Sequence, residues 1–183
     1  MQCVDWAKHT GTGPPAMSRS ATASRAPWED RWAEPSVRQL LSPVPVQHRR
    51  PLEAIIEELD GYDGVAQHIV WYGPGWNWTI QYQFDTTPES CPDVLCYLVP
   101  KQESPIVCVP LREHEIERLP IKRLNRLIRE GIRRAKCAVT VNWATFSPNS
   151  RAEAEQLIDL IRRKHKAATT KPRAKSGAAK ATG

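Results

Sequence analysis

Residues 76–84 alternate between large apolar and polar side chains. The even positions carry Trp, Trp, Ile, Tyr and Phe, and the odd positions carry Asn, Thr, Gln and Gln. A period of two is typical of a β-strand with one buried face and one solvated face, because successive side chains of a strand point to opposite sides. The pattern therefore predicts a strand over 76–84, with Trp76 and Trp78 on the same buried face.

Apolar patterns elsewhere in the chain predict four more strands and three helices. Runs bounded by Gly, Pro or polar residues predict strands at 68–72, 94–99, 106–111 and 138–145. Stripes at helical spacing predict helices at 52–59, 121–135 and 150–166. The element order α-β-β-β-β-α-β-α, with hairpins in the first half, predicts an α+β fold. We expect a mainly antiparallel sheet of about five strands, with the helices packed on one face.

Local signals support the three helices. Pro51 precedes the first helix, and Ser150 with Glu153 forms a capping-box pattern at the start of the last one. The basic run 162–166 complements the dipole at the end of that last helix. Gly131 weakens the long middle helix by roughly 1 kcal/mol relative to Ala. We interpret this glycine as the sign of a close packing contact.

Composition divides the chain into three parts. Residues 1–50 are rich in Pro, Ser, Arg and Ala without periodic apolar positions, which predicts a disordered arm. Within it, the stretch 28–41 has the alternative of a short helix or of folding back onto the domain. Residues 51–166 form the α+β domain, and 167–183 are predicted to be a disordered basic tail. The formal charge of +6 belongs to the two ends, because residues 51–166 hold fifteen basic and sixteen acidic side chains.

Cysteine usage and hydropathy predict a cytoplasmic protein without membrane contact. No apolar run approaches the ~20 residues that cross a bilayer, and the first residues lack a secretory pattern. The five cysteines, at positions 3, 91, 96, 108 and 137, fit reduced thiols better than a disulfide framework.

No spacing in the chain matches a catalytic, metal or nucleotide motif. Cys91 and Cys96 are too far apart for a zinc knuckle, and no second Cys or His pair matches them. Cys96 lies in an apolar strand and is expected to be a buried thiol. His68 and His114 are distant in sequence from any obvious nucleophile. The sequence therefore favours a protein that is not an enzyme, with no cofactor and no bound metal.

Two groups of residues are candidates for binding. The first is an aromatic set around the Gly73–Gly75 turn, which forms either core or an open apolar pocket for a small molecule. It consists of Trp71, Tyr72, Trp76, Trp78, Tyr82 and Trp143. The second is a row of cations on the long helix, within a segment, 118–136, that has eight basic residues and one acid. It consists of Lys122, Arg126, Arg129 and Arg133. This row is either a solvated face or a weak, nonspecific contact for nucleic acid, aided by the tails.

Several short stretches resemble a known family. They are Trp71-Tyr72, Trp76-Asn77-Trp78, Tyr97–Pro100, Ile128–Gly131, Trp143 and Leu157–Lys164. Over about 65–166 the chain resembles bacterial YdhG-like domains of unknown function. The resemblance implies a small α/β domain and supplies no catalytic residue.

Some members of that wider group carry names that invoke iron chaperoning, by comparison with frataxin. The resemblance thus implies an intracellular iron carrier as one alternative function, which would need an acidic ridge. The only dense acids are Glu53, Glu57, Glu58, Asp60 and Asp63, and then Glu113, Glu115 and Glu117. A solvated helix face is the competing explanation for these acids. The leading hypothesis from sequence is a noncatalytic module that binds an unknown small molecule or protein, and the second is an accessory nucleic-acid-associated protein.

Overall fold

The protein is described by a computed structural model over residues 26–85 and 93–169. Its elements are α1 (Val37–Leu41), α2 (Val46–Leu59), β1 (Val65–Trp71), β2 (Trp78–Phe84), β3 (Val94–Val99), β4 (Ile106–Arg112), α3 (Glu113–Arg118), the 3₁₀ helix η1 (Ile121–Arg123), α4 (Arg126–Arg133), β5 (Lys136–Ala138), β6 (Val141–Phe146) and α5 (Arg151–Thr169). All strand pairs are antiparallel, in the order β1-β2-β3-β4-β6-β5. The predicted α+β class is confirmed, with six strands in place of about five.

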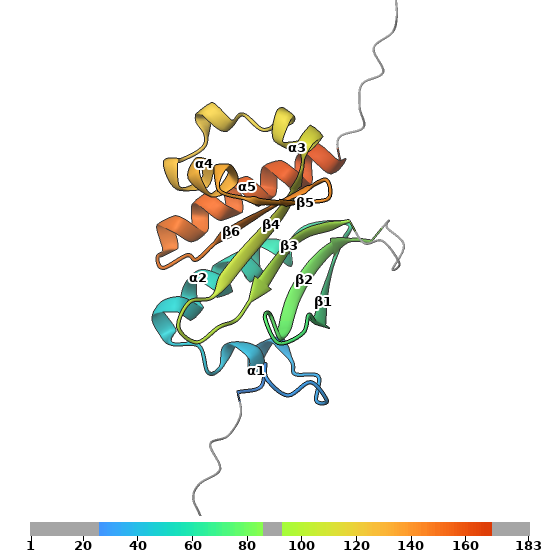
Figure 1. Ribbon diagram of the computed structural model, residues 1–183. Helices are drawn as coiled ribbons and strands as arrows, with labels where there is room; N and C mark the ends of the chain where they lie inside the picture. The colour runs from blue at the N-terminus through green and yellow to red at the C-terminus, as the bar shows by residue number, and fades with distance from the viewer. Residues whose placement is uncertain (1–25, 86–92, 170–183) are drawn as a thin grey trace, which may run out of the picture.

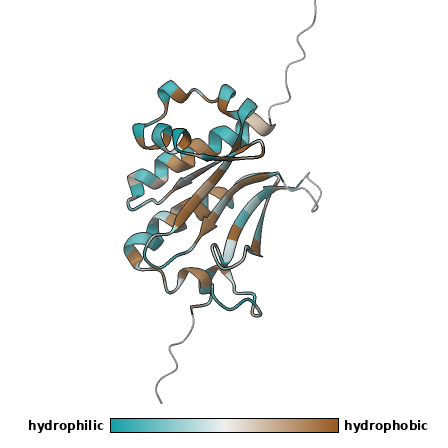
Figure 2. Ribbon diagram, viewed as in Figure 1, coloured by the Kyte–Doolittle hydropathy of each residue, from teal (hydrophilic) through white to brown (hydrophobic). Residues whose placement is uncertain are grey.

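The main core lies between the sheet and its helices. Figure 1 shows α2 and α5 together on one side of the sheet. Their apolar stripes meet the inner side chains of β2, β3, β4 and β6, and Figure 2 shows the strands as the most hydrophobic part of the ribbon. Ile80, Leu98, Leu52 and Leu157 are all fully buried here. This burial is the main favourable term that holds the layers together.

The folded unit begins well before residue 51. Trp28, Leu40 and Val44 are buried in the main core, although we expected residues 1–50 to be a disordered arm. The backbone N–H of Trp78 donates to the carbonyl of Trp28, and the Trp78 indole Nε1 donates to the carbonyl of Asp30 at 2.6 Å. Of the two options for 28–41, the structure shows both a short helix and docking onto the domain.

The expected domain limits shift at both ends. Helix α2 begins at Val46, five residues before the proline expected to start it, and Pro51 lies buried inside the helix. At the other end, residues 167–169 belong to α5 and not to a separate tail. Residues 1–25 and 170–183 lie outside the described ranges, and the disorder predicted for them stays a prediction.

The long helix predicted over 121–135 is broken into shorter pieces. Pro120 disfavours helical geometry at Leu119, so α3 ends there and η1 follows. Asn125 then begins α4, where its side chain accepts a hydrogen bond from the Leu127 N–H at 3.0 Å. Leu124 and Ile128 of the predicted stripe are buried, but the extended backbone at Leu124 and the capping residue Asn125 separate η1 from α4. In the described chain the longest helix is α5, of 19 residues.

Gly131 makes the close contact that the sequence suggested. A Cβ atom at this position would lie 2.1 Å from Cε1 of Phe146, so only glycine lets α4 approach β6 this closely. The chain reaches β6 through a tight hairpin from β5, and this hairpin replaces the single strand predicted at 138–145. Val139 sits at its tip, 99% exposed and with a positive φ of 59°, a strained conformation for a β-branched residue.

A buried lysine holds β3 and β4 together where their pairing stops. The ladder between the two strands ends at Tyr97 and Cys108. Beyond that point, Nζ of Lys164 on α5 donates to the carbonyls of Val94 at 2.6 Å, Leu95 at 3.2 Å and Pro110 at 2.6 Å. Burial lowers the pKa of this lysine, while the three carbonyls satisfy all its donors. Sequence reasoning had placed Lys164 in a basic run that complements the helix dipole, and missed its role as a cross-strand bridge.

Candidate functional site

The six aromatic residues predicted to line a pocket lie on two different sides of the sheet. Trp71, Trp78 and Tyr82 belong to the main core beneath the helices. Trp76 and Trp143 instead pack against a second, smaller cluster on the opposite side, which contains no helical residue among those described. Tyr72 reaches the same side through ring contacts with Trp76. We call this side of the sheet the uncovered face.

The prediction that Trp76 and Trp78 share a face is wrong, and the reason lies at Asn77. This residue has a positive φ of 55°, and its N–H donates to the carbonyl of Gly73. Regular strand geometry therefore starts only at Trp78. The turn directs Trp76 to the uncovered face, where its carbonyl accepts a hydrogen bond from the Thr79 hydroxyl at 3.2 Å. Asn is one of the few residues that tolerate this left-handed conformation.

Four rings form a contiguous group on the uncovered face, which we call the aromatic cluster: Tyr72, Trp76, Tyr97 and Trp143. The centroid of Trp76 lies 5.4 Å from that of Tyr97 and 6.1 Å from that of Trp143, both in edge-to-face contacts. Tyr97 also stacks on Trp143 at 5.8 Å. Such distances fall in the favourable range for aromatic pairs. The cluster has a buried centre, Tyr97, and three partly exposed rings around it.

Tyr97 is the member that sequence reasoning missed. It lies inside β3, a run of six buried residues, so its pattern shows no alternation and no exposed side. The useful signal is its antiparallel pairing with Cys108, which puts both on the face opposite Leu98. That pairing is not visible in one sequence. The structure thus places Tyr97 at the centre of the site, a residue that the predicted aromatic set did not include.

Polar groups adjoin the rings. The Tyr72 hydroxyl donates to Gln81 on β2, and Gln81 in turn donates to Gln83. Burial raises the pKa of Tyr72, and burial together with the Tyr72 hydroxyl raises that of Tyr97. Both phenols therefore stay protonated and neutral at physiological pH. The site combines flat apolar rings with neutral hydrogen-bonding groups.

A cation borders the uncovered face at its β5 edge. Lys136 on β5 is the direct antiparallel partner of Trp143 on β6, so their side chains lie next to each other on the same face. Lys136 is exposed and forms no salt bridge within the described residues. It ends the basic segment 118–136, which we call the cationic segment.

The four cations predicted to line one helix face are spread over two elements. Lys122 lies in η1, whereas Arg126, Arg129 and Arg133 lie in α4, and all four are exposed. Glu130 partly neutralises α4, since it pairs with Arg126 at 2.8 Å and with Arg134 at 4.0 Å. The segment is therefore a broad basic surface and not a continuous helical stripe.

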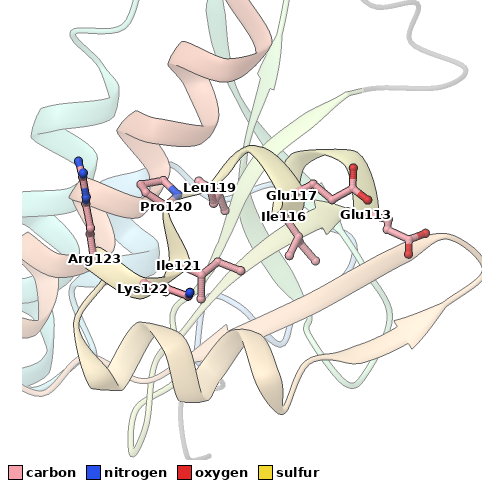
Figure 3. A pocket seen from close by; sticks show the side chains of 8 residues that line it. All are labelled: Glu113, Ile116, Glu117, Leu119, Pro120, Ile121, Lys122 and Arg123. Carbon is pink, nitrogen blue, oxygen red and sulfur yellow. The ribbon is translucent and has the colours of Figure 1, made fainter.

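A cavity of about 560 Å³ lies between α3 and η1 (Figure 3). Its apolar lining comes from Ile116, Leu119, Pro120 and Ile121. Figure 3 shows the carboxylates of Glu113 and Glu117 at one end and Lys122 and Arg123 at the other. The polar groups of this cavity do not converge on one point, which a site for a small ligand normally requires.

A second cavity of about 520 Å³ brings His114 of α3 and Cys137 of β5 to the same surface, together with Asn142. The sequence had left His114 without a nearby thiol. No hydrogen bond joins His114 to Cys137 in the described structure, and the Asn142 amide donates instead to the carbonyl of Leu111 at 3.4 Å. The geometry therefore lacks the nucleophile–base hydrogen bond that covalent catalysis uses.

The buried thiols and several of the acids have structural contacts. Cys96 and Cys108 are fully buried as expected, and burial raises the pKa of each to about 12, so neither is a thiolate at neutral pH. Cys91 lies outside the described residues. Glu58 pairs with Arg162 at 2.7 Å, and Asp60 accepts a hydrogen bond from the Tyr82 hydroxyl at 2.8 Å. Within 26–85 and 93–169, no three His, Cys, Asp or Glu side chains gather as metal ligands would.

The chain matches no protein-family model, no curated protein and no solved structure. The resemblance to YdhG-like domains therefore stays a prediction. Over the part of the chain that is described, no helix is both long and apolar enough to cross a membrane.

Proposed function

We infer that this protein is a noncatalytic binding module whose ligand lies on the uncovered face of the sheet. The observation that carries the proposal is the aromatic cluster. Tyr72 is 41% exposed, and Trp76 and Trp143 are partly exposed, although a folded domain gains most by burying such rings. Large exposed apolar groups that lie together mark interaction sites more often than scattered ones do.

The residues around the cluster favour a binding function over a catalytic one. The buried thiols have strongly raised pKa values, and the Lys164 ammonium is engaged by three carbonyl oxygens. The neutral phenol of Tyr72 and the amides of Gln81 and Gln83 provide fixed hydrogen-bonding groups beside the rings. A rigid set of rings with a few polar groups orders few side chains on binding, which lowers the entropic cost.

The test is a ligand panel against the full chain, read by thermal shift and by indole fluorescence. The panel contains nucleosides, oligosaccharides and short peptides. A ligand at ten times its Kd stabilises the folded state by about 1.4 kcal/mol. We expect a shift that is lost in Trp76→Ala and kept in Trp32→Ala, because Trp32 is 87% exposed and is not one of the four rings of the cluster. A panel without any shift or fluorescence change counts against the proposal.

A further inference from the structure

The aromatic cluster and the cationic segment meet at one pair of residues. Trp143 and Lys136 are partners across β6 and β5, so the outermost ring of the cluster lies beside the first exposed cation. From Lys136 the basic residues continue back along the chain through Arg134 and Arg133 to α4, which packs on the helix-covered side of the sheet. A single extended ligand can therefore contact flat rings on the sheet and positive charges at its edge.

The shape of the uncovered face limits the class of ligand. The three partly exposed rings are about 6 Å apart, with centroids of Tyr72 and Trp76 at 6.0 Å and of Trp76 and Trp143 at 6.1 Å. Neighbouring rings are tilted by 67° and 73°, so they do not present one flat surface. Several separate planar groups, each free to turn, fit these rings better than one rigid ring system does.

The charges select among ligands that carry planar groups. Sugars and apolar peptides stack on aromatic rings but gain nothing from the positive charge of Lys136. A strand of nucleic acid offers unstacked bases for the rings and a phosphate at every step for the cations. Sheets with exposed aromatic residues bind single strands in this way, since every base has a face for stacking.

We propose that the uncovered face binds single-stranded nucleic acid, with bases stacked on Trp76 and Trp143 and the phosphate backbone passing Lys136 at the β5 edge of the sheet. This inference rests on the proposed function, because it names the ligand of the same site. Duplex is a poor fit, since its bases are already stacked on each other and cannot reach the rings.

The test measures binding of fluorescein-labelled oligonucleotides of about 15 nucleotides to the full chain by anisotropy, as single-stranded DNA, single-stranded RNA and duplex DNA. Salt is varied from about 50 to 200 mM, because each phosphate contact adds to the salt dependence. We expect single strands to bind more tightly than duplex. Trp76→Ala and Trp143→Ala should each weaken binding roughly 5- to 100-fold, the range for loss of one stacked base.

Lys136→Glu keeps every ring in place, so it tests the proposal even if a ring variant fails to fold. It should weaken binding at all sequences and reduce the salt slope by roughly one. Arg50→Glu on α2 is the matched charge control, and Trp32→Ala is the matched indole control. Arg50 is exposed on α2, on the helix-covered side, and Trp32 is outside the aromatic cluster, so both variants should leave affinity unchanged.

Two results would overturn the inference. One is duplex bound as tightly as single strands with no effect of the ring variants, which indicates electrostatic contact through the cations and tails alone. The other is no binding of any oligonucleotide at about 50 mM salt. In either case the proposed function still stands if the ligand panel gives a thermal shift that Trp76→Ala abolishes. It fails as well if the panel gives none.

Discussion

The two faces of the sheet differ in what covers their buried side chains, as two neighbouring residues of one strand show. Leu98 and Tyr97 are consecutive in β3, at 0% and 6% exposure. Leu98 lies beneath α2 and α5, in a core that includes residues from nearly every element. Tyr97 lies beneath side chains alone, chiefly Trp76 from the β1–β2 turn and Trp143 from β6. Two equally buried side chains therefore have different roles. Leu98 belongs to the core under the helices, whereas Tyr97 forms the floor of the aromatic cluster.

The largest expected effect is on stability at alkaline pH, and it comes from a buried thiol on each face of the sheet. Cys96 and Cys108 have pKa values of about 12, raised from 9.0, and that of Tyr62 is about 12, raised from 10.0. The unfolded chain loses these protons first, so stability is full below about pH 9 and falls as pH rises toward 12. Each pKa unit is worth about 1.4 kcal/mol, so the loss is on the order of several kcal/mol. Urea unfolding across this window measures it.

Single substitutions separate the two thiols in that experiment. Cys96→Ala and Cys108→Ala should each flatten the alkaline decline by a similar amount, because both sulfurs are fully buried. Lys164 acts in the opposite direction below about pH 10.5, since burial lowers its pKa. If only Cys96→Ala flattens the decline, then Cys108 on the uncovered face is accessible to water. In that case the two faces do not exclude water equally.

Leu98→Ala should be strongly destabilising, because its side chain lies on the face that the helices cover. The substitution removes three carbons and leaves a cavity that the two packed layers cannot easily fill. We expect a loss of about 3 kcal/mol in the free energy of unfolding, measured by urea denaturation. A loss below about 1 kcal/mol would show that this side is as adaptable as the uncovered face.

Gly131→Ala adds a methyl group on the same side and should also destabilise. The new Cβ overlaps the Phe146 ring, and overpacking costs about 2 kcal/mol, which outweighs the gain of roughly 1 kcal/mol in helix propensity. A double-mutant cycle with Phe146→Leu should recover part of the loss, since the smaller side chain makes room. Additive effects in the cycle would rule out the ring contact as the cause.

Trp76→Ala should cost less stability than Leu98→Ala, at about 1.5 kcal/mol, because the ring is partly exposed and no helix rests on it. The same change should strongly weaken binding at the uncovered face. Thermal denaturation and ligand titration of one protein sample separate the two effects. A stability loss as large as that of Leu98→Ala would make the aromatic cluster a second core and not a surface.

Val139→Asn should give the smallest effect, and with the opposite sign. The β5–β6 turn belongs to neither face, and its valine has a positive φ that Asn adopts more readily. We expect a gain of about 0.5 kcal/mol in the free energy of unfolding. Val139→Ile, which keeps the branched Cβ, is the control and should give no gain.

The sequence predicted the fold class because the patterns that set it are local. The alternation over 78–84, the apolar run at 94–99 and the stripe of α5 all appear in the structure as expected elements. Two errors came from single residues that override a pattern. Asn77 reverses the direction of Trp76, and Asn125, the N-cap of α4, divides a stripe that reads as one helix.

The candidate site was only half predictable, because its composition depends on strand pairing. Tyr72, Trp76 and Trp143 were named from sequence, but Trp71, Trp78 and Tyr82 were grouped with them since all are aromatic and near the same turn. The pairing of Lys136 with Trp143 could not be predicted from the sequence either, because the segment 136–138 is too short to show a strand pattern. These contacts join residues whose relation is fixed only by the register of the sheet.

The bridge made by Lys164 bears on when this protein completes its fold during synthesis. Lys164 donates to the carbonyls of Val94 and Pro110, which precede it in the chain by 70 and 54 residues. It lies near the end of α5. Until the ribosome has released that helix, the gap between β3 and β4 has no ammonium to close it. The contact between β3 and β4 therefore stays incomplete in the emerging chain until α5 has left the ribosome.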